Sequence, residues 1–248
     1  MTLVRYESAD RVATITMDRR EKHNALNGAL CEELRQAWIR FRDSDDRVAV
    51  LASSEDAYFS VGADVKDFPV NMWHAVPGLG VELDKPVIAA VAGPAVAGGF
   101  ELALWCDVRV MESSAYFGVY CRRWGVPLVD GGTVRLPRIV GMGRALEIIL
   151  TGRKVPAEEA LRIGACEHLV PDGRSRDFAE AMAHEIARFP QACVRADRRS
   201  AYMQQGLPLR EAMRKEWYNG FPAFEIDGAA GAARFASGKG RHGDFRDI

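Results

Sequence analysis

Two glycine-containing segments of the sequence carry the residue types and spacing best suited to chemistry. One is residues 58–67 (YFSVGADVKD), and the other is residues 85–107, in which an apolar run leads to Gly98-Gly99. The run predicts a buried strand, and the glycine pair predicts the start of a helix. Small residues at a helix N-terminus leave backbone N–H groups open, so this turn is suited to binding an anion. The alternative is a tight turn whose small residues only avoid a clash.

Several common catalytic motifs are missing from the sequence. It has no GxGxxG after an expected strand and no GxxxxGK[ST], and Tyr58 stands where a nucleophile elbow around Ser60 needs glycine. The five histidines show no HExxH or paired-ligand spacing, so we expect no metal site. The sequence therefore gives no support for placing the protein among the dinucleotide enzymes, the P-loop NTPases or the α/β-hydrolases.

Composition excludes further classes. The 248 residues are 48% hydrophobic and 27% charged, with a net charge of −1, which is ordinary globular composition without the basic balance of a general nucleic-acid binder. The longest uncharged stretch, residues 86–100, is shorter than the roughly 20 apolar residues of a membrane span. Charged residues at the N-terminus argue against a secretory signal. The five widely spaced cysteines predict free thiols and a cytoplasmic location.

The elements that must position these segments follow from hydrophobic periodicity. Strands are expected at 12–17, 48–52 and 87–91, and an amphipathic helix that Asn27 caps is expected to carry Leu30, Leu34, Trp38 and Phe41. Strands alternating with helices predict an α/β or α+β core. Later helices are expected at 144–150, 157–163, 176–189 and 209–219. Pro190 divides the chain into a core, 1–190, and a C-terminal helical region, 191–248, whose tail from Gly228 is expected to be mobile or ordered by a partner.

Four motifs in order carry a family resemblance. They are residues 20–27 (REKHNALN), 59–66 (FSVGADVK), 85–107, and 135–141 (RLPRIVG) with 150–152 and 159–164. They resemble the enoyl-CoA hydratase/isomerase (crotonase) family over nearly the whole chain. The resemblance implies a spiral of ββα units followed by helices that pack homotrimers or hexamers. It also implies an acyl-CoA substrate, as in fatty acid metabolism, and no cofactor beyond the coenzyme A of that substrate.

The resemblance also assigns binding positions. The thioester oxygen is expected to accept hydrogen bonds from the backbone N–H groups of Ala63 and Gly98, which would stabilise an enolate; losing one such donor costs roughly 10²–10³ in rate. The family's coenzyme A positions fall on His23 and Ala25 at the adenine end and on Asp64 and Lys66, with Lys66 near the phosphates. The alternative for Lys66 is a solvated surface lysine.

Carboxylates decide the reaction, and here the chain departs from the family. Hydratases of this family hold a water between two glutamates. Glu101 matches the first position, whereas Cys121 stands at the second. A thiol with a reference pKa of about 8.5 is a poor substitute for a carboxylate, so Cys121 is expected to be a packing residue rather than a nucleophile. Asp130, in an Asp-Gly-Gly sequence that resembles the dihydroxynaphthoyl-CoA synthases of the family, is the candidate replacement; the alternative is an ordinary Asp-Gly turn.

We therefore expect an acyl-CoA enzyme that acts through an oxyanion-stabilised enolate. Hydration by Glu101 and Asp130 is favoured over a double-bond shift that uses Glu101 alone. A catalytically silent acyl-CoA binder is the alternative from another class, and a mutase-like ring closure, which Asp130 alone supports, is the least favoured reaction. The acyl group is not predicted by the sequence.

Overall fold

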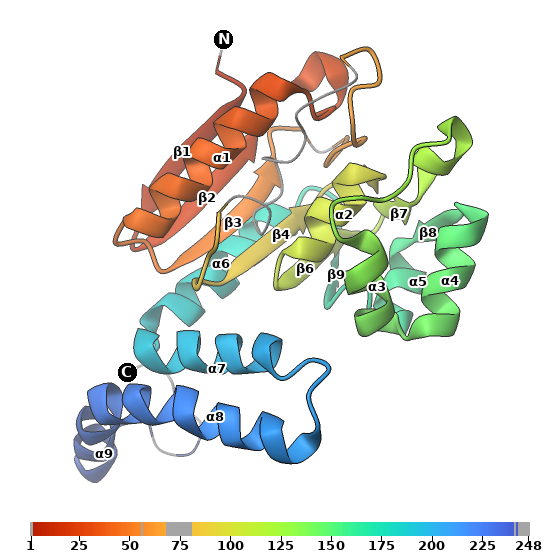
Figure 1. Ribbon diagram of the computed structural model, residues 1–248. Coiled ribbons are helices and arrows are strands. Elements are labelled where there is room, and N and C mark those ends of the chain that lie inside the picture. The colour runs from red at the N-terminus through yellow and green to blue at the C-terminus, as the bar shows by residue number, and fades with distance from the viewer. Residues whose placement is uncertain (1, 56, 68–80, 241, 243–248) are drawn as a thin grey trace.

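The computed structural model describes residues 2–55, 57–67, 81–240 and 242. Its main sheet has six strands in the order β1-β2-β3-β4-β6-β9, and all neighbours are parallel except β1 and β2. Figure 1 shows this sheet running diagonally through the molecule. The strands are β1 (Val4–Ala9), β2 (Val12–Met17), β3 (Val48–Ser53), β4 (Val87–Val91), β6 (Val108–Glu112) and β9 (His168–Val170).

Helices cover both faces of the sheet because its central strands are apolar on both sides. In β3, Val48 and Val50 belong to the apolar cluster that includes α6 (Ser175–Arg188), whereas Ala49 and Leu51 belong to the cluster that includes α1 (Gly28–Asp43). Alternate residues of a strand point to opposite faces, so this division follows directly from the strand period. A parallel sheet buried on both faces is typical of α/β proteins.

The predicted helix after the first motif is confirmed as α1. The side chain of Asn27 accepts a hydrogen bond from the Leu30 N–H at 3.0 Å, which satisfies one of the open donors of the first turn. Leu30, Leu34, Trp38 and Phe41 are buried. The short 3-10 helix η1 (Arg20–Lys22) fills the turn between β2 and α1.

A second, smaller sheet lies beside the first and carries the elements of the site. Its strand order is β5-β7-β8, formed by β5 (Pro94–Val96), β7 (Tyr116–Gly118) and β8 (Lys154–Pro156). The helix α2 (Gly98–Trp105) follows β5, and η3 (Tyr120–Trp124) follows β7. Around them lie α3 (Gly132–Val140), α4 (Met142–Thr151) and α5 (Ala157–Ile163), on the right of Figure 1.

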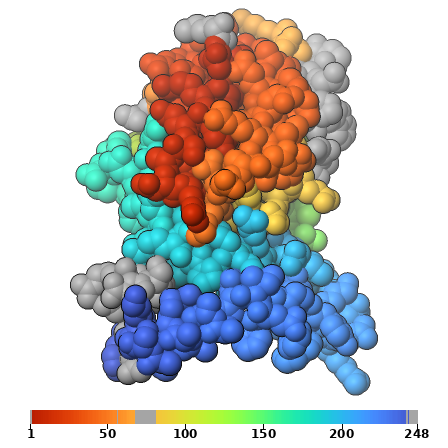
Figure 2. Space-filling model, turned by 90° about the vertical axis from the view of Figure 1, so that its left-hand side faces the viewer, coloured from red at the N-terminus to blue at the C-terminus, as the bar shows by residue number. Residues whose placement is uncertain are grey.

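Helices dominate the chain after residue 190. They are α7 (Gln191–Met203), α8 (Leu209–Ala223), the π-helix η4 (Phe224–Gly228) and α9 (Ala229–Ala236). Figure 1 shows them as a layer below the sheet, and in Figure 2 the same blue residues form the bottom of the molecule. Arg198 and Tyr202 of α7 bind the Asp107 carboxylate at 2.9 and 2.6 Å and thereby attach this layer to the core.

The expected tail from Gly228 begins with a helix, and its mobility or its ordering by a partner stays a prediction. Residues 229–236 form α9 in the isolated chain, because alanine favours helix strongly enough to offset the glycines beside it. Residues 241 and 243–248 of that tail lie outside the described residues. Across the described residues, no helix has the length and apolar character that crossing a membrane requires.

Candidate functional site

Two loops meet to form the centre of the site. Gly62 has φ +84°, and a Cβ added to it would lie 2.8 Å from both the Gly98 nitrogen and the Ala97 Cβ. A Cβ added to Gly99 would lie 2.3 Å from the Ser60 carbonyl oxygen. Only glycine permits backbones to approach so closely. These glycines therefore bring the segment around Ala63 against the N-terminus of α2.

The amides of Ala63 and Gly98 are open at this junction. Neither N–H donates to another residue of the described chain, and both residues line a cavity of about 250 Å³. Ala97, which precedes the helix, has φ +52° and ψ −124°, a combination that a residue with a Cβ rarely adopts. The turn thus carries backbone strain of the kind found at ligand-binding sites.

Glu101 lies in the first turn of α2, on the wall of the same cavity. Its side chain is 2% exposed, and its Oε1 accepts hydrogen bonds from the Asp130 and Gly132 N–H groups at 2.9 and 2.8 Å. Burial raises the pKa of Glu101 to about 7, although the two amides oppose the shift. A carboxyl group with this pKa can both accept and donate a proton near neutral pH.

Asp130 supplies the second buried carboxyl group. It is 4% exposed, lines the cavity with Glu101, and its carboxylate accepts no hydrogen bond from the described part of the chain. Burial raises the pKa of Asp130 to about 6. The Asp-Gly-Gly sequence does form a turn, since Gly131 has φ +97° and α3 begins at Gly132. The two interpretations of Asp130 are therefore compatible: the residue belongs to an Asp-Gly turn, and its carboxyl group is buried at the cavity.

Cys121 also lines the cavity, from η3. Burial raises the pKa of its half-buried thiol, and the nearby Glu101 raises it further. The thiol is therefore protonated near neutral pH and is a weak base. This agrees with the interpretation that Cys121 does not replace the second glutamate of the family.

Sequence reasoning missed most of the remaining cavity wall. These residues are apolar or aromatic and come from loops on both sides of the site: Val61, Val65, Ala97, Tyr120, Trp124, Val126, Pro127 and Val129. Trp124 is 75% exposed, which is unusual for the largest side chain. No periodic pattern marks such positions, because short loops bring them together only in the folded chain.

The four predicted coenzyme A positions lie together, next to the amide pair. Arg19 connects two of them, since its Nη1 donates to the Ala25 carbonyl at 2.7 Å and to the Asp64 carboxylate at 2.8 Å. The exposed His23 ring stacks on Tyr58 at 3.9 Å, and Lys66 is exposed two residues after Asp64. The Asp64 carboxylate thus forms an ion pair with Arg19, while His23 and Lys66 face solvent.

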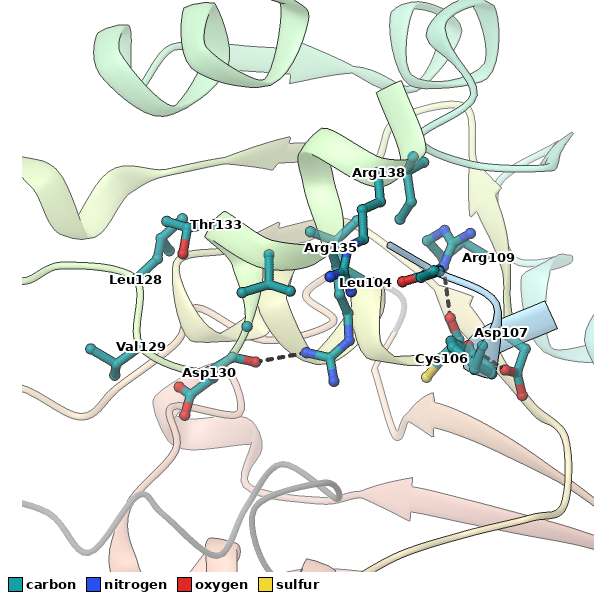
Figure 3. A pocket seen from close by; sticks show the side chains of 15 residues that line it. Leu104, Cys106, Asp107, Arg109, Leu128, Val129, Asp130, Thr133, Arg135 and Arg138 are labelled. Carbon is teal, nitrogen blue, oxygen red and sulfur yellow. Dashed lines mark hydrogen bonds between the residues drawn. The ribbon is translucent and has the colours of Figure 1, made fainter. Parts of the chain in front are cut away.

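A second cavity of about 500 Å³ lies behind the turn that holds Asp130. Asp130 and Val129 line both cavities, and Arg135 and Arg138 of α3 contribute to the second (Figure 3). Within the described residues, no group of three or more His, Cys, Asp or Glu side chains is placed to hold a metal ion.

Comparison with known proteins places the chain in a family. The family model described as enoyl-CoA hydratase/isomerase matches residues 7–216. The (E)-benzylidenesuccinyl-CoA hydratase of Thauera aromatica is 33% identical over 220 residues, which cover 85% of this chain and 86% of that protein. The enoyl-CoA hydratase EchA19 of Mycobacterium tuberculosis is 32% identical over 228 residues, covering 87% and 86%.

Solved structures agree with this result. The crystal structure of enoyl-CoA hydratase from Mycobacterium tuberculosis H37Rv has a TM-score of 0.90 and 32% identity, and the match covers 96% of each chain. The family model, the relatives and the solved structures thus indicate one class of enzyme, which acts on acyl-CoA. The chain belongs to the enoyl-CoA hydratase/isomerase family, has the crotonase fold, and acts on acyl-CoA thioesters.

Proposed function

We propose that the protein hydrates an enoyl-CoA thioester, with Glu101 and Asp130 as its two acid–base groups. The observation that carries the proposal is that both carboxyl groups are buried on the wall of one cavity, into which the Ala63 and Gly98 amides also open. Hydration needs two proton transfers, one from water and one to carbon, and the site offers one carboxyl group for each.

The amide pair is the proposed site for the thioester oxygen. When water adds to C3, negative charge develops on that oxygen as the enolate forms. Two preorganised N–H donors in a cavity lined mostly by apolar residues stabilise this charge more than they stabilise the neutral carbonyl. The proposed step requires no cofactor other than the coenzyme A that the substrate carries.

The two carboxyl groups divide the proton transfers between them. Their pKa values of about 7 and about 6 lie close together, so the pair holds one proton over a window near neutral pH. Two amides favour the ionised form of Glu101, whereas Asp130 has no such donors. Despite these donors, Glu101 has the higher pKa of the two, so we assign the two transfers to the pair: its ionised member takes a proton from water, and its protonated member delivers one to C2.

The two carboxyl groups of this cavity also distinguish hydration from the alternative functions. A one-base isomerase would need only Glu101, and a silent binder would need neither carboxyl group. Burying a second carboxyl group without hydrogen-bond donors carries a desolvation cost, which is typical of functional sites. The buried position of Asp130 therefore favours the two-acid reaction.

The direct test is incubation with a panel of enoyl-CoA esters, read by mass spectrometry. Hydration predicts a gain of one water, and in H₂¹⁸O the product carries the heavy oxygen. A product of equal mass with a moved double bond would identify an isomerase. Absence of any product across the panel, with tight binding of the same thioesters, would identify a silent binder.

We propose further that coenzyme A extends from the amide pair along His23, Ala25, Asp64 and Lys66. Lys66 is exposed and can therefore donate to phosphate oxygens, whereas Asp64 positions the segment through Arg19. Lys66→Ala is expected to raise KM several-fold with little change in kcat. A cytoplasmic location also stays a proposal, based on cysteines that form no disulfide.

A homotrimer, or a hexamer built as a dimer of trimers, is the proposed assembly. One apolar stripe on α8 and η4 is exposed and consists of Leu209, Met213, Trp217, Phe221 and Phe224. A different exposed set lies on α3 and α4, at Val134, Met142, Leu146 and Leu150. Two unlike patches favour head-to-tail contacts, which close into rings. A sedimentation mass near 27.4 kDa at working concentration would contradict the proposal.

A further inference from the structure

Arg135 lies directly behind the turn that connects the two carboxyl groups. Its Nη1 donates to the Asp130 carbonyl oxygen at 3.0 Å (Figure 3). A Cβ added to Gly131 would lie 1.9 Å from the same nitrogen, so the guanidinium occupies the space that a side chain at Gly131 would need. Helical side chains point toward the helix N-terminus, which is why Arg135, one turn into α3, reaches back to this turn.

The turn has two functional sides. Toward the cavity of about 250 Å³ that Glu101 lines, the turn presents the Asp130 and Gly132 N–H groups, and both donate to Glu101 Oε1. Away from that cavity it presents the Asp130 carbonyl, which Arg135 holds. In Figure 3 the Asp130 carboxylate points away from the guanidinium. Arg135 therefore contacts the backbone of the turn and leaves the acidic group free.

We propose that Arg135 is a positioning residue that sets both the geometry and the charge of the Glu101–Asp130 pair from behind. The inference rests on the proposed function of that pair. Arg135 has no carboxylate partner in the described part of the chain and only the Asp130 carbonyl as hydrogen-bond acceptor there. Arg135 is half-buried, and a partly desolvated cation held by a carbonyl alone gains little from its own contacts, so its position favours a role toward the groups around it.

The electrostatic surroundings of the pair are simple. The positive charge of Arg135 opposes the burial that raises the pKa of Glu101 and of Asp130. Two thiols also face the pair, Cys121 on Glu101 and Cys31 on Asp130, and burial raises the pKa of both. Arg138, Cys106 and Tyr202 surround Arg135 on the far side. Among the described residues, Arg135 is thus the cation that acts on both carboxyl groups.

The test compares R135Q, R135K and R138Q, the last removing an exposed charge from the same helix and cavity. R135Q is expected to move the acidic limb of kcat/KM upward by about one pH unit and to lower kcat roughly 10–100-fold. R135K keeps the positive charge, so the acidic limb of its kcat/KM profile should stay at the parent's pH. Its kcat should fall less than that of R135Q. The kcat of R138Q is expected to stay within about twofold of the parent. All three variants should bind an unreactive acyl-CoA with an affinity within about twofold of the parent's.

A readout that does not need turnover separates this inference from the proposed reaction. In protein labelled at the Asp and Glu carboxyl carbons, the Asp130 signal, assigned with D130N, is expected to titrate at higher pH in R135Q even if no enoyl-CoA is hydrated. An unshifted titration, or a kcat that falls by the same factor at every pH, would make Arg135 structural only and overturn the inference. If R135Q does not fold, R135K decides, since a limb or titration shifted in R135K would contradict the charge role.

Discussion

A Cβ on Gly62 would lie 2.8 Å from the backbone nitrogen of Gly98, so the two loops of the site meet without room for one added carbon. Gly62→Ala must separate these loops and force an L-residue into φ +84°. We expect turnover to fall roughly 10²–10³-fold, because the amide pair loses its geometry. Unfolding free energy should fall by about 1–3 kcal/mol.

Gly143→Ala is the matched control, because a Cβ there meets nothing within 4 Å and the residue lies inside α4. Alanine favours helix over glycine, so stability should stay equal or rise by up to about 1 kcal/mol. Parent-like turnover in Gly62→Ala would refute the packing argument for the amide pair.

The pH dependence of kcat/KM should report the buried carboxyl pair. Hydration needs one group ionised and one protonated, so the rate is expected to be highest between about pH 6 and pH 7. It falls below that window as the base is protonated, and above it as the acid is lost. A flat profile from pH 5 to pH 9 on a substrate that the parent converts would disagree with the assignment.

The raised pKa of Glu101 also has a consequence for stability. The folded protein keeps the Glu101 proton up to a pKa of about 7, whereas the unfolded chain loses it near the reference value of 4.5. The stability contributed by this group is therefore complete below the reference value and is lost as pH rises through 7. Glu101→Gln, which stays neutral, should be more stable than the parent at pH 8 by on the order of 1–3 kcal/mol.

Urea unfolding at pH 4.5 and pH 8 measures this difference, which should nearly vanish at the lower pH. Glu158→Gln, at an exposed position of α5, should show no such gain at pH 8. A Glu101→Gln difference that does not change with pH would show that burial does not control this group.

Strong local patterns explain which parts of the fold were predictable. The strands at 12–17, 48–52 and 87–91 and the helix that Asn27 caps are confirmed, because period and capping chemistry act over a few residues. The edge strand β1 alternates weakly, and its partly exposed residues give little hydrophobic signal. α3 was missed because it begins with Gly132 after the N-cap Gly131 and contains Pro137.

The site shows the same division between local and long-range signals. The motifs around Gly62, Gly98 and Glu101 are local features, so the family resemblance could assign Ala63, Gly98 and Glu101 from them; the structure brings the three residues to one cavity, and their roles stay predictions. Whether Asp130 was an ordinary turn residue depended on burial, which only the packing of α3 against α2 provides. Arg135 carried one possible signal, its place one helical turn after the Asp-Gly-Gly sequence.

The most direct measurement of the central claim compares single-turnover hydration by the parent, Glu101→Gln, Asp130→Asn and Cys121→Ser on one converted enoyl-CoA. Removing either carboxyl group should reduce the rate roughly 10²–10⁴-fold, while Cys121→Ser keeps most of it because a protonated thiol offers little basicity. Full activity in Asp130→Asn, or a loss in Cys121→Ser as large as that in Glu101→Gln, would contradict the account.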